Sequence, residues 1–257
     1  MMNDNVAKPI GEVLNPFLER IRNFEITPEM EARQLEFERE DEARRLWEAK
    51  EAEERRLDKI RIPKRYRGLT LDEYPVRSEA QESVVQYLRG YINRDLSIME
   101  NLIIHGYPGT GKTHMMCAFL QWCGKYRGEY WKLSSIMRRA KGNFSSQEET
   151  EEHFLGQLSE IPILIIDEVG RAGGTAYESS FMFDLLDNRY DNLLPTILVS
   201  NLPVEGEISM TSYLGISVMD RINENSLDIP CEWGNYRDHA EITIRTRLEL
   251  EEQADDQ

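Results

Sequence analysis

Apolar runs of strand length alternate with amphipathic stretches of helix length from residue 78 to residue 233. Strands that alternate with helices along a chain favour a parallel sheet with helices on both of its faces. The pattern therefore predicts an α/β domain. We expect strands at 101–105, 128–133, 162–167, 195–200 and 227–233, and helices at 78–94, 112–124, 134–142, 149–159, 178–191 and 215–222.

Residues 1–60 have a different pattern, with many charged positions and few apolar ones. An amphipathic helix is expected near the N-terminus, and a longer charged helix after Thr27, a residue type that caps helix N-termini well. Acidic and basic side chains recur at i to i+4 distances, which supports a solvated helix. The segment is either a solvated spacer or an arm that docks on another protein through Phe17, Phe24 and Trp47.

A glycine-rich loop, GYPGTGKTH, follows the strand expected at 101–105 and precedes a predicted helix. It satisfies the pattern G-x-x-x-x-G-K-[ST], in which backbone N–H groups cradle phosphates. Lys112 would reach the β- and γ-phosphates of a nucleotide, and Thr113 would hold Mg²⁺ through its hydroxyl. The loop residues expected to bind the nucleotide are Gly106, Tyr107, Pro108, Gly109, Thr110, Gly111, Lys112, Thr113 and His114.

Two carboxylates, Asp167 and Glu168, end the apolar run ILII, at the edge where open α/β sheets bind ligands. Asp167 suits the binding of the nucleotide's Mg²⁺ together with Thr113, and Glu168 can polarise an attacking water. Asn201 follows the next predicted strand, where its amide can sense the γ-phosphate or simply serve the turn before Pro203. This arrangement fits an ATPase that does work better than a small-molecule kinase.

Two arginines follow these motifs, Arg221 on a short predicted helix and Arg237 after the last strand. An arginine that reaches a neighbour's γ-phosphate couples the subunits of ring ATPases. Both positions also suit a helix end or a surface charge, so spacing alone leaves the two interpretations open.

The charge balance limits what the chain binds strongly by itself. It has 31 basic and 47 acidic residues and a formal net charge of −16, whereas proteins held mainly by phosphate charge are basic. Any nucleic-acid contact is therefore expected to be local or made inside an oligomer. No apolar run approaches ~20 residues and there is no signal core, so we expect a cytoplasmic protein without membrane contact.

The motifs together resemble those of DnaC-type replicative helicase loaders, which are AAA+ ATPases related to the initiator ATPase and to transposition helper ATPases. GYPGTGKTH, ILIIDEVG, TILVSN, LGISVMDRI and WGNYR occur in the family's order over roughly residues 61 to 240. Ile216 and Ser217 depart from the family, which usually has charged residues before VMDR. The arm is unlike that of cellular loaders, which fits a phage or prophage version.

The resemblance implies an AAA+ P-loop NTPase fold with a five-stranded parallel sheet, helices on both faces, a reduced helical lid and an N-terminal helical arm. ATP and Mg²⁺ would be the cofactors. The implied catalytic residues are Glu168, Asn201 as first sensor, Arg221 as arginine finger and Arg237 as second sensor. The implied segments are a docking arm at 1–60, a linker and adenine-pocket entry at 61–78, the ATPase domain at 79–244 and an acidic tail at 245–257.

The resemblance also implies a function and its partners. The arm would grip the hexameric replicative DNA helicase, and the chain would self-associate in a ring or spiral on it. ATP binding and hydrolysis would act as the switch that helps place the helicase on single-stranded DNA. Phe144, Thr175 and Tyr177 are candidates for DNA contact, because aromatic rings stack on bases without net positive charge; alternatively, the aromatic side chains pin loops to the domain.

Two other functions compete with the loader interpretation. A transposition helper ATPase would act with a transposase on DNA, and we would expect it to carry a basic N-terminal domain instead of this mixed, acidic arm. A non-catalytic adaptor would bind ATP without hydrolysing it usefully. The presence of Lys112, Asp167 and Glu168 argues against the adaptor.

Overall fold

The computed structural model describes residues 27–123, 128–142, 150–171 and 174–234. The chain divides into two compact units, residues 1–54 and residues 55–257. Several predicted features lie outside the described residues. These are the helix with Phe17 and Phe24, the loop with Phe144, the second sensor Arg237, the lid and the acidic tail.

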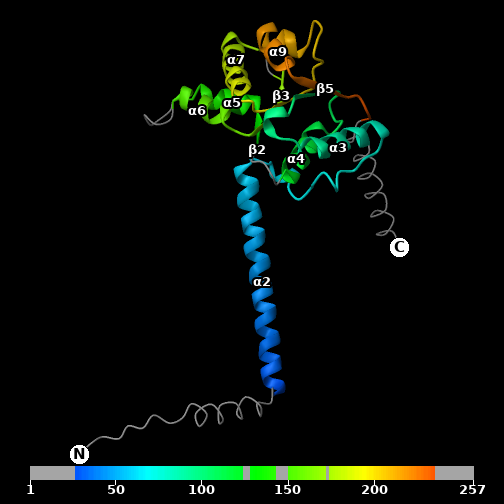
Figure 1. The fold of residues 1–257 in the computed structure, drawn as a ribbon, viewed down its shortest axis with the longest axis vertical. Coiled ribbons are helices and arrows are strands. Elements are labelled where there is room, and N and C mark those ends of the chain that lie inside the picture. The colour runs from blue at the N-terminus through cyan, green and yellow to red at the C-terminus, as the bar shows by residue number, and fades with distance from the viewer. Residues whose placement is uncertain (1–26, 124–127, 143–149, 172–173, 235–257) are drawn as a thin grey trace, which may run out of the picture. The chain divides into compact units, whose positions relative to one another are not determined.

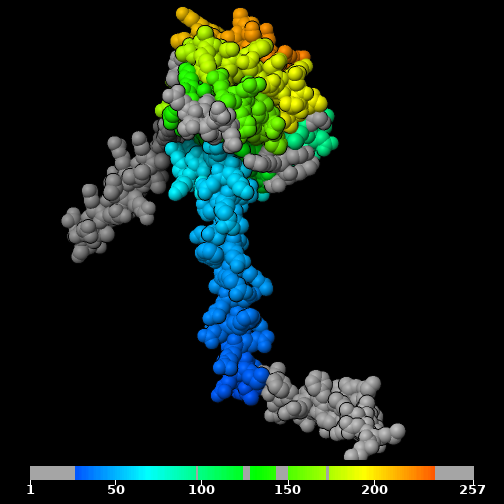
Figure 2. Space-filling view, turned by 90° about the vertical axis from the view of Figure 1, so that its left-hand side faces the viewer, coloured from blue at the N-terminus to red at the C-terminus, as the bar shows by residue number. Residues whose placement is uncertain are grey.

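Helix α2 (Pro28–Lys59) provides the described structure of the first unit. The Thr27 hydroxyl accepts a hydrogen bond from the Met30 N–H at 3.3 Å, so the predicted N-cap is confirmed. Figure 2 shows this helix in blue. Four of its large apolar side chains, between residues 35 and 47, are exposed. They are Leu35, Phe37, Leu46 and Trp47. Leu35 and Leu46 share one helical face because about three turns separate them, whereas Phe37 and Trp47 lie on other faces. The four side chains therefore form no continuous apolar stripe.

The second unit contains a five-stranded parallel sheet in the order β2-β3-β4-β1-β5. This confirms the predicted α/β fold and each predicted strand to within two residues at most of its ends. The strands are β1 (Asn101–Gly106), β2 (Gly128–Lys132), β3 (Ile163–Val169), β4 (Thr196–Ser200) and β5 (Ser226–Cys231).

Helices cover both faces of the sheet and form two apolar cores (Figure 1). Successive residues of β1 alternate between them: Leu102 and Ile104 enter one core, and Ile103 enters the other. The first core lies under α3 (Glu79–Tyr91) and α4 (Lys112–Trp122). The second lies under α5 (Leu133–Ala140), α6 (Glu151–Ser159), α7 (Ala176–Asp191), α8 (Met210–Leu214) and α9 (Ile216–Asn223).

Short elements were not predicted from the sequence pattern. Helix α8 has only five residues and begins with a capping box at Ser209. The 3₁₀ turns η1 (Lys64–Tyr66) and η2 (Leu96–Ile98) have three residues each. Elements of this length are too short to display a helical repeat of apolar positions.

The compact second unit starts at Arg55, before the arm boundary expected at residue 60. The physical reason is burial, since Leu57, Ile60 and Ile62 belong to the first apolar core. The Ile60 carbonyl also accepts a hydrogen bond from the Tyr130 N–H at 3.0 Å, at the edge of the sheet. The last turn of α2 is therefore part of the compact second unit. Within the described residues, no helix combines the length and apolar character needed to cross a bilayer.

Candidate functional site

The loop between β1 and α4 depends on two glycines with positive φ. Gly106 has φ 129°, and a Cβ at this position would lie 2.4 Å from the Cys231 carbonyl oxygen. Gly111 has φ 88° and is the N-cap of α4. Only glycine adopts such angles without strain. The loop can therefore close over the N-terminus of α4, where N–H groups and the helix dipole favour a bound phosphate.

The Lys112 ammonium lies inside this loop. Its Nζ donates hydrogen bonds to the carbonyl oxygens of Gly106 at 2.7 Å and Tyr107 at 2.8 Å. Burial lowers the pKa of Lys112, while Cys231 and Asp167 act in the opposite direction. A cation held by two neutral carbonyls can exchange them for phosphate oxygens, which are charged and stronger acceptors.

A cavity of about 670 Å³ extends from this loop over the carboxyl edges of β3 and β4. It brings together most of the predicted nucleotide residues with Glu168 and Asn201. The linker also contributes to it, although its predicted role at the adenine pocket stays a prediction. The lining residues predicted to act are Pro108, Gly109, Gly111, Lys112, Thr113, His114, Asp167, Glu168 and Asn201, and the linker residues are Arg65, Tyr66 and Pro75.

His114 lies in an aromatic cluster on the linker side of the cavity. Its ring stacks on Tyr66 with centroids 5.7 Å apart and meets the edge of Tyr74 at 5.3 Å. Burial, and then the charge of Arg65, lower the pKa of His114, which favours a neutral imidazole. The Arg65 guanidinium lies 4.4 Å from the centre of the Tyr66 ring, so this side of the cavity combines flat rings with one positive charge. Flat surfaces of this kind can pack against a nucleobase.

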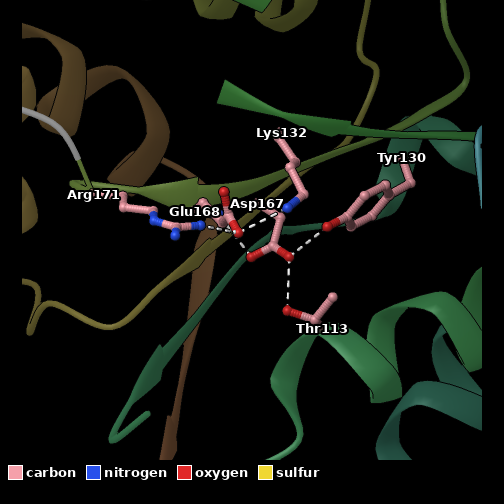
Figure 3. A network of polar contacts seen from close by, with 6 residues as sticks. All are labelled: Thr113, Tyr130, Lys132, Asp167, Glu168 and Arg171. Atoms are coloured by element: carbon pink, nitrogen blue, oxygen red, sulfur yellow. Dashed lines mark hydrogen bonds and ion pairs between the residues drawn. The ribbon is translucent and has the colours of Figure 1, made fainter. Parts of the chain in front are cut away.

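Asp167 is buried and accepts hydrogen bonds at both carboxylate oxygens. Its Oδ2 accepts from the hydroxyls of Thr113 and Tyr130 (Figure 3), and both distances are 2.7 Å. Its Oδ1 accepts from the Glu168 N–H at 2.7 Å. With its proton directed at Asp167, the Thr113 hydroxyl keeps a lone pair for a cation. Thr113 and Asp167 thus form a set of oxygen donors that fits Mg²⁺.

Glu168 occupies a strained position at a bulge in the sheet. Its φ is 60°, and the register of β3 against β4 shifts between Ile166 and Val169. Bulges re-aim side chains, and strained backbone clusters at functional sites. The carboxylate is thereby placed at the cavity beside Asp167.

Two cations hold Glu168 in this structure. Lys132 Nζ lies 2.9 Å and Arg171 Nη1 2.7 Å from the same oxygen, Oε1 (Figure 3). Burial raises the pKa of Glu168, but the hydrogen bonds and charges of Lys132 and Arg171 outweigh it, so the pKa is lowered. A carboxylate with a lowered pKa is a weaker base. Both contacts are made to Oε1, and they reduce the strength of Glu168 as a base.

Arg221 lies on α9, as predicted, but is not among the residues that line the cavity of its own chain. It forms ion pairs with Asp187 at 2.6 Å and Glu224 at 3.3 Å. Its guanidinium also lies 4.7 Å from the centre of the Tyr190 ring. These contacts orient the side chain, and they leave its predicted role in a neighbour's site untested.

Two of the DNA-contact candidates have structural partners. Thr175 is the N-cap of α7 and accepts from the Glu178 N–H at 3.2 Å. Tyr177 packs against Phe181 with ring centroids 6.4 Å apart, and Lys141 lies 4.9 Å from the centre of its ring. These contacts agree with loop pinning, and a contact of either residue with DNA stays a prediction.

Sequence reasoning missed three residues around the carboxylates, namely Tyr130, Lys132 and Arg171. A signal existed for Lys132, since it lies next to the end of the strand predicted at 128–133, on the edge of the sheet where ligands bind. Nothing in the sequence assigns Tyr130 to Asp167, because the two strands lie far apart along the chain.

Trp233, the first residue of the motif WGNYR, is a further contact of the phosphate loop. Its indole Nε1–H donates to the Thr110 carbonyl at 2.8 Å, and its ring packs against the first core. Thr110 is fully buried, so this carbonyl has few alternative partners. The segment after β5 thus fixes the loop that is expected to bind phosphates.

We expect Trp233→Phe to weaken ATP binding, since the loop loses a hydrogen bond of about 0.5–1.5 kcal/mol net. Titration with a fluorescent ATP analogue should show a several-fold higher Kd. Trp122→Phe is the matched control, because Trp122 packs against the same core. Equal affinity in Trp233→Phe and the parent would contradict the role given to the indole.

The chain is similar in sequence to a known protein family and to replicative helicase loaders. The family described as IstB-like ATP binding protein matches residues 33–242. The replicative helicase loader DnaC of Buchnera aphidicola subsp. Acyrthosiphon pisum is 31% identical over 192 residues, which cover 72% of this chain and 75% of the relative. DnaC of Escherichia coli strain K12 is 30% identical over 178 residues, covering 67% and 70%.

Solved structures share the fold. The crystal structure of the DnaC helicase loader superposes with a TM-score of 0.57 at 24% identity, covering 65% of this chain and 99% of that one. The replication initiator DnaA bound to AMPPCP and single-stranded DNA gives 0.53 at 19% identity, covering 65% and 50%. At these identities the likeness concerns the fold alone.

Proposed function

The chain belongs to the family of IstB-like ATP-binding proteins, and from that premise we propose that it is an ATP-dependent loader of the hexameric replicative DNA helicase. The observation that carries the proposal is its 31% identity with a replicative helicase loader over three quarters of that relative. The cavity with its phosphate loop and carboxylate pair supports an ATP-driven role.

In this proposal ATP binds in the cavity, with its phosphates on the loop and Lys112. Thr113 and Asp167 hold Mg²⁺, which neutralises phosphate charge when bound. Glu168 acts as the base that polarises the attacking water, once Lys132 and Arg171 release it. Asn201 is exposed at the cavity edge, where its amide can sense the γ-phosphate.

Self-association would complete the site between neighbouring copies. Arg221 would leave Asp187 and Glu224 and reach the γ-phosphate of the next copy, as an arginine finger does. Both of its partners are only partly buried, so the exchange for a phosphate has a modest desolvation cost. Arg237 would serve as the second sensor in the same assembly.

Contact with single-stranded DNA would be made by stacking and not by net charge. The chain carries a net charge of −16, so it gains little from counterion release. Phe144, Thr175 and Tyr177 remain the proposed contacts. Affinity for the loading site would come mainly through the helicase, in the cytoplasm where replication takes place.

A transposition helper is the alternative function. The family description, IstB-like, covers ATP-binding proteins in general terms. The curated relatives named above are replicative helicase loaders, and their identity to this chain favours the loader. The alternative predicts a transposase as the partner and duplex DNA as the target.

The proposal is tested with the purified chain, the replicative helicase of the same organism, ATP and single-stranded DNA. We expect helicase to appear on the DNA, measured by gel filtration, only when the chain and ATP are both present. Lys112→Ala should remove most ATP affinity and therefore most loading, because the phosphates lose a point charge. Failure to bind the helicase, together with stimulation of a transposase, would favour the alternative.

A further inference from the structure

Tyr130 is a buried phenol next to the site, and the chemistry proposed above does not use it. It lies on β2, which pairs with β3 so that Tyr130 is opposite Ile165, two residues before Asp167. Its side chain is 3% exposed and belongs to the first apolar core. A polar hydroxyl in such a place is costly unless it finds a hydrogen-bond partner.

The partner of this hydroxyl is the acidic residue that would support Mg²⁺. Tyr130 donates to Asp167 Oδ2 at 2.7 Å, the oxygen that also accepts from Thr113 at 2.7 Å. The phenol proton is directed at Asp167, so the Tyr130 hydroxyl is the donor in this contact.

These contacts fix the carboxylate of Asp167 from three sides. An ionised carboxylate has about four lone-pair positions for donors. Three are used here, by Thr113, Tyr130 and the Glu168 N–H. Without the Tyr130 hydroxyl, the carboxylate could rotate away from Thr113, and the Thr113 proton would lose its acceptor.

We propose that Tyr130 is a positioning residue for the metal of the nucleotide site, holding Asp167 in the orientation that aligns the Thr113 hydroxyl for Mg²⁺. This inference rests on the proposed function, because it assumes that the cavity binds a metal–nucleotide complex. Residues behind the first ring of metal ligands commonly tune metal affinity through such hydrogen bonds. Figure 3 shows Tyr130 and Thr113 meeting at Asp167 from different elements.

The test uses Tyr130→Phe in the full chain, a change that keeps the ring and removes only the hydroxyl. We expect Mn²⁺, used as the probe with ADP and followed by electron paramagnetic resonance, to bind about 10-fold more weakly. The Mg²⁺ concentration that gives half-maximal ATP hydrolysis should rise by a similar factor. Binding of a fluorescent ADP analogue in EDTA should not change, because no metal is present.

Tyr91→Phe is the matched control, since Tyr91 is a fully buried tyrosine whose hydroxyl donates to a backbone carbonyl, that of Glu100, at 2.6 Å. It should leave Mn²⁺ affinity unchanged. Equal Mn²⁺ affinity in Tyr130→Phe and the parent would overturn the inference, and so would an equal loss of affinity in Tyr91→Phe. Neither result would contradict the proposed ATP site. A parent chain that binds no nucleotide, either with Mg²⁺ or in EDTA, would instead overturn the proposed function.

Discussion

Glu168→Gln should bind ATP with parental affinity and hydrolyse it about 10²–10⁴-fold more slowly, the usual contribution of a general base. The amide keeps the shape of the side chain but cannot accept a proton from water. The cavity, the phosphate loop and Asp167 stay as they are, so the nucleotide still has its contacts. Single-turnover hydrolysis and equilibrium binding, measured on the same preparation, separate the two effects.

Glu129→Gln is the control for this substitution. Glu129 lies on β2, the neighbour of β3, but outside the nucleotide cavity, where it accepts from Arg61 and Trp131. It should hydrolyse ATP at the parental rate. Since Glu168→Gln also weakens the ion pairs with Lys132 and Arg171, its melting temperature should be compared with that of the parent. Undiminished turnover in Glu168→Gln would show that another group is the base.

Removal of residues 1–54 should abolish binding to the replicative helicase and leave ATP binding intact. The described part of this segment exposes apolar side chains along α2, among them Leu46 and Trp47. A partner that covers these side chains would gain the free energy of burying apolar surface, and the arm would then be its docking segment. Pull-down of the helicase and titration with a fluorescent ATP analogue measure the two properties separately.

The end point of the truncation follows from the structure. A fragment that starts at residue 61 would lose Leu57 and Ile60 from the apolar core, and a loss of ATP binding could then come from unfolding. A fragment that starts at Arg55 keeps the compact unit whole. If this fragment bound the helicase at parental affinity, the docking hypothesis would be wrong and the arm would be a spacer.

A point substitution sharpens the same test. Binding energy concentrates in a few aromatic anchors, at about 2 kcal/mol or more each on truncation. Trp47→Ala should therefore weaken the helicase complex, and Glu48→Ala, the exposed neighbour on the same helix, should not. Equal effects of the two substitutions would argue against an aromatic anchor.

The sequence by itself determined the succession of strands and helices along the chain and the position of the phosphate loop. Buried parallel strands are continuous apolar runs, such as ILII before Asp167, and they can be predicted without knowledge of the neighbouring strand. The phosphate loop can also be predicted locally. Gly106 and Gly111 adopt backbone angles that other residues avoid, so the glycines themselves mark the loop in the sequence. Thr27 as a helix cap is also a local property, and its prediction is confirmed.

Only the tertiary structure decided which side chains surround the carboxylates and where the second compact unit begins. The sheet places β2 beside β3, so Tyr130 meets Asp167 and Lys132 meets Glu168 across 37 and 36 positions of the chain. Burial of Leu57 likewise depends on a core built by distant elements. Such contacts follow from strand order and register, which are set by the packing of the whole domain and leave no periodic signal in the local sequence.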